Sequence, residues 1–452
     1  MKIIIVGLGK VGQKLTERLS QEGEHDITVI DTRRAILHDV VNSYDVMGVV
    51  GSGASIETLQ EAGVDHTDIL IAVTGSDELN LLTCLIARKL NVCNTIARVR
   101  NPEYKKEVQL FQEDLGLAMI INPEFTAARE IARLLRFPSA VQIDTFAKGR
   151  VEILKFRIPS GSPLCDLKVV DIAQKLGCDI LVCGVERGEE AFIPGGDFTL
   201  REGDYVSIVA TIRDVTHFIK KIGLKTNKVK NTMIVGGGKT AVYLANLLLK
   251  AGIDVTIIEQ NPDRCEELCE MLPKATIING DGTENRLLLE EGIESAESFV
   301  ALTNIDEENV MLSLYAKTQT KGKIVTKINR IAYDEVISSL GLDTIIYPKD
   351  ITAEYILRFV RAKNNSIGSN IETMHDILDG KAEALEFNIL KNAPIANRTI
   401  ESLSLKPGIL IALINRDGNI ITPRGKDTIL PGDTVIVVTT NKGYNDIGDI
   451  LK

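Results

Sequence analysis

The sequence is poor in the residues on which several common kinds of site depend. Its seven cysteines form no C-x-x-C pair, its five histidines are scattered, and no HExxH segment occurs. These absences exclude the usual zinc and metalloprotease patterns, so we expect no catalytic metal. The cysteines are expected to be reduced, partly buried side chains.

Positive charge and long apolar runs are also scarce. The chain has 52 lysines and arginines against 62 aspartates and glutamates, a net charge of −10, so it has no basic excess for holding a nucleic-acid backbone. No apolar run approaches the roughly 20 residues that span a bilayer, and the first run ends at Gly7, too early for a signal peptide. We therefore expect a cytoplasmic protein that reaches a membrane only through another protein.

The sequence does contain a long internal repeat. Three motifs recur after 229 residues and a fourth recurs after 231. The pairs are Gly7–Gly12 with Gly236–Ala241, Gly51–Ala54 with Gly280–Thr283, Ala72–Asn80 with Ala301–Asn309, and Gly149–Phe156 with Gly380–Phe387. With 452 residues, 44% of them hydrophobic, the chain is large enough for several buried cores. A repeat of this length indicates a duplicated two-domain unit rather than a solenoid.

The first part of each copy alternates short β-branched runs with amphipathic stretches. In copy one the predicted strands are Lys2–Val6, Ile27–Ile30, Val46–Val50, Ile69–Val73, Thr95–Val99 and Ala118–Ile121, and the predicted helices include Val11–Gln21 and Glu78–Leu90. Six such steps predict a parallel sheet covered on both faces, as in a doubly wound Rossmann-like domain. Asn122–Arg136 is predicted to be a connecting helix that Pro138 stops.

The second part of each copy has a different pattern. In copy one, the β-rich runs Val151–Ile158, Ile180–Val185 and Tyr205–Val209 are separated by turns rich in glycine and proline, which predicts a small α+β domain. The predicted fold class is therefore α/β, with two Rossmann-like doubly wound parallel-sheet domains, each followed by a small α+β domain, in tandem. The predicted bounds are 1–122 and 231–348 for the Rossmann-like pair, and 140–225 and 366–452 for the small pair.

The two glycine loops predict nucleotide sites. In a G-x-G-x-x-G turn between a strand and a helix, the glycines allow the tight turn, the close approach of a pyrophosphate and the packing of the helix on the sheet. The context also requires an acid near the end of the second strand, about 20 residues on. Asp31 stands there in copy one and Glu259 in copy two, where Ala241 takes the third glycine position. Because a carboxylate accepts hydrogen bonds from ribose hydroxyls and repels a 2′-phosphate, we expect adenine nucleotides such as NAD.

Basic residues follow the strands at the same edge of each predicted sheet. Lys10 and Lys239 lie inside the glycine loops, and Arg98 and Arg100 follow the fifth strand of copy one. Lys327 and Arg330 stand near the equivalent edge of copy two. Cations at the carboxyl edge of a parallel sheet suit the negative charge of a triphosphate, as in ATP. The alternative is that each is a solvated charge at the rim.

Together these motifs resemble the TrkA family, the peripheral nucleotide-binding subunits of Trk potassium-uptake systems. The likeness extends over the whole chain and depends on Gly7–Gly12, Asp31, Ala72–Asn80, the Asn101–Tyr104 segment, and their partners in copy two. The resemblance implies tandem RCK units, each with a Rossmann N-lobe and a small C-lobe. It also implies a ring at the cytosolic face of the cell membrane that docks on the potassium-translocating subunit and gates it according to bound NAD(H), ATP or ADP.

One loop departs from the family pattern. The loop after the third strand is usually G-D-(A/G)-(T/S), which copy two keeps in Gly280–Thr283, whereas Gly51–Ala54 of copy one has neither the acid nor the hydroxyl. The motifs and the resemblance together assign the following residues to nucleotide binding: Gly7, Leu8, Gly9, Lys10, Val11, Gly12, Asp31, Thr32, Gly53, Ala54, Thr74, Asn80, Arg98, Arg100, Gly236, Gly237, Gly238, Lys239, Thr240, Ala241, Glu259, Asp281, Gly282, Thr283, Thr303 and Lys327.

Two other functions share the Rossmann-like domain. An NAD-dependent dehydrogenase also needs a general acid/base, and in a duplicated enzyme we would expect that group twice. None of the five histidines has a histidine at the corresponding position of the other copy, which favours a protein that is not an enzyme. A nucleotide sensor of a different cation transporter is the third alternative, since the sequence does not name the membrane partner.

Two further expectations concern assembly and the two sites. The repeat and the resemblance predict a homo-oligomer, a tetramer with eight Rossmann-like lobes. The sites are predicted to differ, because Arg98 and Arg100 can fork onto several phosphate oxygens whereas Lys327 is a point charge. Copy one should therefore respond more to a triphosphate, and copy two should tolerate NAD or ADP.

Overall fold

The computed structural model describes two compact units. The described residues are 1–452 except Glu24, Asn91, Cys93, 102–116, 137–139, 147–150, Asp179, Glu189, 224–228, 331–336, 338–339, Asp343, 366–370, 379–380, Lys442 and Asn445. Pro138 and most of the Asn101–Tyr104 segment therefore lie outside the described residues. One unit combines Met1–Ala132 with Val229–Val360, and the other combines Arg133–Lys228 with Arg361–Lys452. Each unit is thus built from both copies of the repeat.

The first lobe of the first unit contains a six-stranded parallel sheet in the order β3-β2-β1-β4-β5-β6. The strands are β1 (Lys2–Val6), β2 (Asp26–Asp31), β3 (Met47–Val50), β4 (Ile69–Ala72), β5 (Asn94–Arg98) and β6 (Met119–Ile121). All six predicted strands are confirmed to within one residue at each end. This strand order reverses between β1 and β4, and the crevice at such a switch point is where doubly wound sheets bind ligands.

Helices cover this sheet. They are α1 (Lys10–Glu22), α2 (Arg34–Ser43), α3 (Ile56–Glu61), α4 (Asp77–Lys89) and α6 (Pro123–Arg136). The predicted connecting helix is α6, and it begins where the sequence places a cap and a proline. The Asn122 carboxamide oxygen accepts a hydrogen bond from the Phe125 amide at 2.8 Å, and Pro123 occupies the first helical position.

The second lobe repeats this arrangement, with the strand order β14-β13-β12-β15-β16-β17. Its strands are β12 (Asn231–Val235), β13 (Asp254–Glu259), β14 (Thr276–Asn279), β15 (Ser298–Ala301), β16 (Lys323–Lys327) and β17 (Ile345–Ile346). Its helices are α9 (Lys239–Lys250), α10 (Pro262–Met271), α11 (Asn285–Glu290), α12 (Asp306–Gln319) and α14 (Pro348–Asn365). The predicted Rossmann-like fold is confirmed in both copies.

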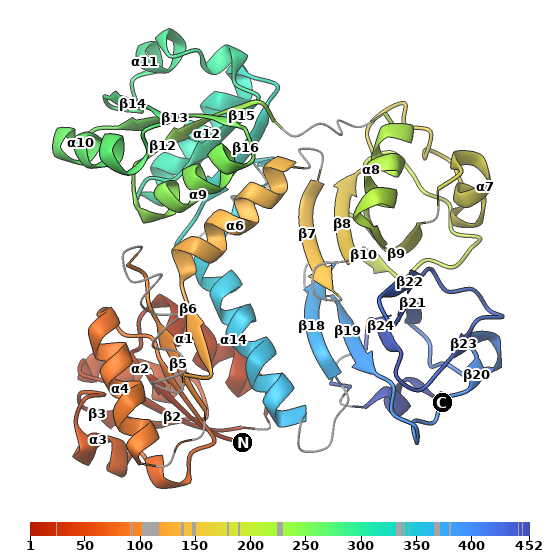
Figure 1. The fold of residues 1–452 in the computed structure, drawn as a ribbon, viewed down its shortest axis with the longest axis horizontal. Helices are drawn as coiled ribbons and strands as arrows, with labels where there is room; N and C mark the ends of the chain where they lie inside the picture. The colour runs from red at the N-terminus through yellow and green to blue at the C-terminus, as the bar shows by residue number, and fades with distance from the viewer. Residues whose placement is uncertain are drawn as a thin grey trace. The chain divides into compact units, whose positions relative to one another are not determined.

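Helix α14 belongs to copy two in the sequence but packs on the sheet of copy one. Its residues Ala353, Ile356, Leu357 and Val360 are in one buried cluster with Ile3, Leu15, Ile96 and other residues of the first lobe. Figure 1 shows α14 beside the first lobe. These four positions lie on one face of a helix, so the helix supplies an apolar stripe that completes the core of the other copy.

The second unit contains the two small domains. Their five-stranded sheets have the orders β10-β9-β11-β8-β7 and β18-β19-β24-β21-β22, and every pairing in them is antiparallel. The strands are β7 (Ala140–Phe146), β8 (Val151–Arg157), β9 (Leu181–Arg187), β10 (Glu190–Phe192), β11 (Tyr205–Thr211), β18 (Ile371–Ile377), β19 (Ala382–Asn388), β21 (Ile409–Arg416), β22 (Asn419–Ile421) and β24 (Thr434–Thr439), and a further pair consists of β20 (Arg398–Thr399) and β23 (Thr428–Ile429). The helices of the first small domain are α7 (Ile172–Leu176) and α8 (Ile212–Lys221).

The two small domains share a buried core. Val151, Ile153 and Val209 of copy one belong to one cluster with Ala384 and Ile436 of copy two. The predicted β-rich α+β character is confirmed, since β8, β9 and β11 coincide with the three predicted runs. Because each copy contributes to this core, the small domains form a pair within the chain.

Candidate functional site

The glycine loops lie at the switch point of each sheet, between β1 and α1 and between β12 and α9. Gly7 has a φ of +98°, and an added Cβ would lie 2.8 Å from the Thr74 backbone. A Cβ at Gly12 would lie 1.9 Å from the Gly7 carbonyl oxygen, so the first loop requires glycine at both ends. Gly236 has the corresponding φ of +100°, whereas the third position of copy two holds the buried methyl of Ala241.

The acid at the end of the second strand contacts its own glycine loop. Asp31 Oδ2 accepts a hydrogen bond from the Leu8 amide at 2.7 Å, and Glu259 Oε2 accepts one from the Gly237 amide at 2.7 Å. The second oxygen of Glu259 accepts from the Asn261 amide at 2.9 Å. The predicted acids therefore meet the predicted loops, and each fixes the backbone of the loop's second residue.

Two arginines that the sequence analysis missed reach the same loops. Arg33 Nη2 donates to the Leu8 carbonyl oxygen at 3.4 Å, and Arg264 Nε donates to the Gly237 carbonyl oxygen at 2.9 Å. They come from non-equivalent positions, because the 229-residue offset places Pro262 opposite Arg33. Repeat alignment alone therefore could not find them, although Arg33 stands only two residues after the predicted acid.

Arg33 also changes the charge balance around Asp31. Its Nε lies 3.1 Å from Asp31 Oδ1 and its Nη2 lies 3.1 Å from Oδ2. Burial of the carboxylate acts to raise its pKa, but the hydrogen bonds from the Arg33 side chain and from the Arg33 and Leu8 amides outweigh burial, so the pKa of Asp31 is lowered. Asp31 is therefore ionised at neutral pH and can accept further hydrogen bonds.

A buried asparagine joins the ends of two neighbouring strands in each lobe. Asn80 is fully buried, and its Oδ1 accepts from the Thr74 amide at 2.8 Å while its Nδ2 donates to the Arg98 carbonyl oxygen at 2.9 Å. Asn309 makes the matching bonds to the Thr303 amide at 2.8 Å and to the Lys327 carbonyl oxygen at 3.0 Å. These amides position the carboxyl ends of β4 and β5, and of β15 and β16, from which the basic side chains project.

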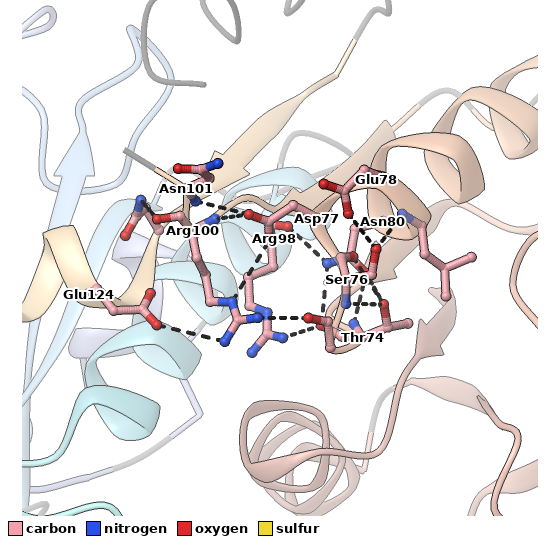
Figure 2. Close-up of polar contacts among 12 residues, drawn as sticks. Thr74, Ser76, Asp77, Glu78, Asn80, Arg98, Arg100, Asn101 and Glu124 are labelled. Carbon is pink, nitrogen blue, oxygen red and sulfur yellow. Dashed lines mark hydrogen bonds and ion pairs between the residues drawn. The ribbon is translucent and has the colours of Figure 1, made fainter. Parts of the chain in front are cut away.

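Arg98 and Arg100 project from the carboxyl end of β5. The acidic Glu124 of α6 lies beside them (Figure 2). Arg98 donates to the Thr74 carbonyl oxygen, and Arg100 Nη2 donates to the Gly75 carbonyl oxygen at 2.7 Å. Burial lowers the pKa of Arg98, and the charge of Arg100 lowers it further. Glu124 faces Arg100 with 4.0 Å between Oε1 and Nη1. The Nε atoms of both arginines and Oε2 of Glu124 are buried without a hydrogen-bond partner.

Lys327 holds the position of Arg98 in copy two. Its Nζ donates to the Leu302 carbonyl oxygen at 3.0 Å, and only 7% of the residue is exposed. Burial lowers the pKa of Lys327 to about 8, although the charges of Asp306 and Glu124 oppose this change. At neutral pH the ammonium is charged.

The loop after the third strand, which in copy one departs from the family pattern, forms a turn in both copies. Asp281 Oδ1 accepts from the Thr283 amide and from the Thr283 hydroxyl, both at 2.8 Å, and these bonds lower the pKa of Asp281. In copy one Ser52 Oγ accepts from the Ala54 amide at 3.2 Å. The turn is thus kept with a neutral oxygen in place of the carboxylate.

More than half of the residues predicted to bind nucleotide line one of two cavities. A cavity of about 350 Å³ in copy two is lined by the glycine loop, the acid and the third-strand loop. The predicted residues on its wall are Gly236, Gly237, Gly238, Glu259, Asp281, Gly282 and Thr303. A larger cavity of about 1060 Å³ takes walls from both lobes of the first unit. The predicted residues on that wall are Lys10, Val11, Arg98, Arg100, Gly238, Lys239, Thr240 and Lys327.

The larger cavity, here called the interlobe cavity, lies at helix N-termini of both copies. Lys10 and Lys239 stand at the first positions of α1 and α9, and Pro123 and Pro348 stand at the first positions of α6 and α14. Helix N-termini and cations both favour anions. Other predicted residues lie away from this wall, such as the exposed Thr32 beside Asp31.

Two absences apply to the described part of the chain. No group of three or more histidine, cysteine, aspartate or glutamate side chains among the described residues could hold a metal ion. Within the same residues, no helix combines the length and the apolar character needed to cross a membrane.

Family models match four segments of the chain. The TrkA-N domain model matches residues 3–123 and 232–348, and the TrkA-C domain model matches residues 153–223 and 384–452. These matches alternate as the Rossmann-like lobes and small domains do.

The chain belongs to the TrkA family.

Curated members of the TrkA family match over almost the entire chain. The "Trk system potassium uptake protein TrkA" of Halomonas elongata is 33% identical, with 98% of this chain and 96% of that protein covered. The protein of the same name in Haemophilus influenzae is 32% identical with the same coverage, and "TrkA homolog 2" of Methanosarcina mazei is 30% identical over the full length of both.

Solved structures match the fold at lower identity. "Crystal Structure of the GsuK RCK domain" has a TM-score of 0.63 at 19% identity, and covers 97% of this chain and 92% of that one. "GsuK channel bound to NAD" has the same TM-score and identity and covers 97% of this chain and 77% of that one. At this identity the likeness shows the fold, which agrees with the RCK arrangement that the resemblance implied.

Proposed function

We propose that this TrkA-family chain is a nucleotide-sensing regulatory subunit that binds NAD(H), ATP or ADP in its Rossmann-like lobes and gates a potassium-translocating membrane protein. The proposed protein acts without catalysing a reaction. It works at the cytosolic face of the cell membrane, to which its Trk-type membrane partner holds it.

The observation that carries this proposal is the interlobe cavity. Seven basic residues from both copies line it, against three glutamates. The Nε atoms of Arg98 and Arg100 are buried without a hydrogen-bond partner, with Arg100 Nε 3.7 Å from Asp77 Oδ1, and phosphate oxygens are acceptors that guanidinium groups bind well. The acid of each copy, Asp31 or Glu259, is bonded to its glycine loop, which supports a role in binding the ribose of an adenine nucleotide.

The names of the relatives supply the ligands to test first. Two GsuK structures of this fold are bound to NAD and to ADP, respectively. The potassium uptake named for the curated relatives supports a potassium-transporting partner. ATP is added to the list because of the paired arginines at the cavity.

Assembly of several chains follows from a pair of exposed apolar residues. Leu82 on α4 and Met311 on α12 are 46% and 66% exposed, and they lie 229 residues apart at equivalent positions. Equivalent apolar side chains on two lobes would let identical chains close a ring through repeated contacts, and we propose a tetramer.

Calorimetry with NADH, ATP and ADP tests nucleotide binding. Asp31→Ala should weaken binding to copy one by about 1–3 kcal/mol, because ribose hydroxyls lose their charged acceptor. Asp45→Ala, which removes an exposed carboxylate from the same lobe, is the control. Absence of binding by all three nucleotides would overturn the proposal, and so would oxidation of NADH above background with a simple carbonyl substrate.

The gating step needs the membrane partner. Potassium flux through proteoliposomes that contain the partner should change when the chain is added, and the change should depend on which nucleotide is present. Flux that is unaffected by the chain under every nucleotide condition would contradict regulation of that partner.

A further inference from the structure

We propose that Tyr243 couples the two nucleotide sites, by linking the glycine-loop helix of copy two to the segment of copy one that carries Arg98 and Arg100. This inference rests on the proposed nucleotide-binding function. It assigns a positioning role to a residue that lies outside the glycine motif and outside the interlobe cavity wall.

Tyr243 stands on α9, two residues beyond the end of the glycine loop of copy two. Only 6% of the residue is exposed, and its ring packs edge-to-face on Phe125 of α6, with ring centroids 5.4 Å apart. A displacement of α9 by a phosphate at its N-terminus would therefore move a ring that packs against copy one.

The hydroxyl of Tyr243 makes two hydrogen bonds, both to copy one. It accepts from the Asn122 carboxamide nitrogen at 2.9 Å and donates to the Arg100 carbonyl oxygen at 3.3 Å. Burial raises the pKa of Tyr243 to about 12, so the hydroxyl stays protonated and keeps its donor at neutral pH. The same oxygen thus meets the N-cap of α6 and the backbone of an arginine that lines the interlobe cavity.

Asn122 and Arg100 extend this link to the cavity. Asn122 caps α6 through the Phe125 amide, and its nitrogen also donates to the Arg100 carbonyl oxygen at 3.3 Å. The Arg100 amide donates to Asp77 Oδ2 at 2.8 Å. The Arg100 backbone is thus held on one side by α4 of its own lobe and on the other by Tyr243 of the other lobe. Its guanidinium would respond to either side.

The residue of copy one that corresponds to Tyr243 is not a tyrosine. The 229-residue offset places Lys14 of α1 opposite Tyr243, and Lys14 Nζ pairs with Glu17 of its own helix at 3.0 Å. A lysine cannot reproduce the aromatic packing or the donor-and-acceptor hydroxyl. The Tyr243 phenol therefore makes a contact that Lys14 does not, and thermodynamic linkage makes its effect reciprocal between the sites.

A cycle of four proteins tests the coupling: the unaltered chain, Tyr243→Phe, Glu259→Ala, and both changes together. Glu259→Ala disables the proposed copy-two site, and calorimetry with ATP then reports the affinity of copy one in each protein. In the unaltered background Glu259→Ala should change that affinity by at least about fivefold, the lower end for allosteric coupling. In the Tyr243→Phe background the change should fall to less than about twofold.

Two more variants keep the result interpretable if Tyr243→Phe alters stability. Asn122→Ser leaves an oxygen to cap α6 but removes the amide that binds Tyr243, and it should reduce the coupling as Tyr243→Phe does. Tyr315→Phe removes a phenol oxygen from α12 of the same lobe and should leave the coupling unchanged. Thermal melts of all variants report the folding cost separately.

The cycle distinguishes failure of the proposed nucleotide binding from failure of the proposed coupling. If no protein of the cycle binds ATP, NADH or ADP, the proposed function fails. If nucleotides bind and Glu259→Ala has the same effect with Tyr243 and with Phe at position 243, the sites bind nucleotide but Tyr243 does not couple them. Coupling that Tyr315→Phe reduces equally would also overturn the assignment.

Discussion

Arg33 and Asp31 form a two-point ion pair beside the first glycine loop, with Nε to Oδ1 and Nη2 to Oδ2 both at 3.1 Å. The arginine is mostly exposed and the aspartate is buried. The pair therefore helps to set the ionisation of the residue that we assign to the ribose.

Replacing Arg33 should lower the free energy of unfolding at neutral pH and make it depend less on acid. The pKa of Asp31 lies below its ordinary value of 3.8, so its stabilising effect is present above that value and is lost as pH falls through the lower folded-state pKa. In Arg33→Ala only the Leu8 and residue-33 amides offset burial, so the folded-state pKa rises toward 3.8 and the stability lost on acidification becomes smaller. Urea denaturation between about pH 3 and 6 measures this, with the exposed neighbour in Arg34→Ala as the control. Superimposable pH profiles for Arg33→Ala and the unaltered chain would contradict it.

Titration of Lys327 should make the free energy of unfolding rise with pH and the affinity of copy two for a phosphate fall. Its folded pKa of about 8 lies below the ordinary value of 10.5, so between these values the unfolded chain holds more protons and stability rises with pH. The gain should be on the order of 1–3 kcal/mol and should be absent in Lys327→Met. Over the same range the affinity of copy two for a phosphate should fall, because the ammonium loses its charge. If both quantities move in the same direction in the unaltered chain, Lys327 does not titrate there.

The two sites should differ in their response to the third phosphate. Arg100→Ala should lower the affinity for ATP about tenfold and the affinity for NADH less. Lys327→Ala should lower the affinities for ATP, ADP and NADH more evenly. Asn329 holds the position of Arg100 in copy two, so Asn329→Arg should increase the preference of that copy for ATP over ADP. Calorimetric titrations of the three variants provide the comparison. An ATP affinity that Arg100→Ala leaves unchanged and Lys327→Ala abolishes would mean that the assignment is reversed.

Gly12→Ala should damage the first loop although alanine is the natural residue at position 241. The new Cβ would lie 1.9 Å from the Gly7 carbonyl oxygen, and backbone must move to admit it. We expect a loss of about 1–3 kcal/mol in the free energy of unfolding, together with weaker nucleotide binding at copy one. Gly9→Ala is the matched control, because no atom lies within 4 Å of its added Cβ. Equal melting temperatures for the two variants would show that the loop adapts.

Charge on the exposed apolar residues should disrupt the proposed tetramer. Leu82→Glu combined with Met311→Glu should lower the mass measured by light scattering at micromolar concentration, since a buried carboxylate opposes association. Met47→Glu, at an equally exposed methionine on β3, should leave the mass unchanged. A monomeric mass for the unaltered chain, with and without nucleotide, would count decisively against assembly.

The sequence predicted the local structure of each lobe well because the relevant signals are local. Apolar runs such as Ile3–Val6 define strands, and the Asn122–Pro123 pair marks the start of α6. The glycine loops and their acids were found by spacing alone, and the structure brings each acid to its loop.

The partners of these elements could not be predicted in the same way. The periodicity of Ala353, Ile356 and Val360 predicts a helix with one apolar face, but it does not say that this face covers the sheet of the other copy. Arg264 was missed for a related reason, because its role depends on where α10 directs it and not on its position in the repeat. Long-range packing decides both.

The exchanged helix α14 has a consequence for synthesis of the chain. Ala353 follows Ile121, the last core residue contributed by the first sheet, by 232 residues. At about 5–20 residues per second, the ribosome makes that sheet on the order of 10–50 seconds before the helix that completes its core. During this interval the apolar surface that α14 will cover is open to solvent on a nascent chain. Cellular folding of the first lobe is thus timed by translation of the last quarter of the message.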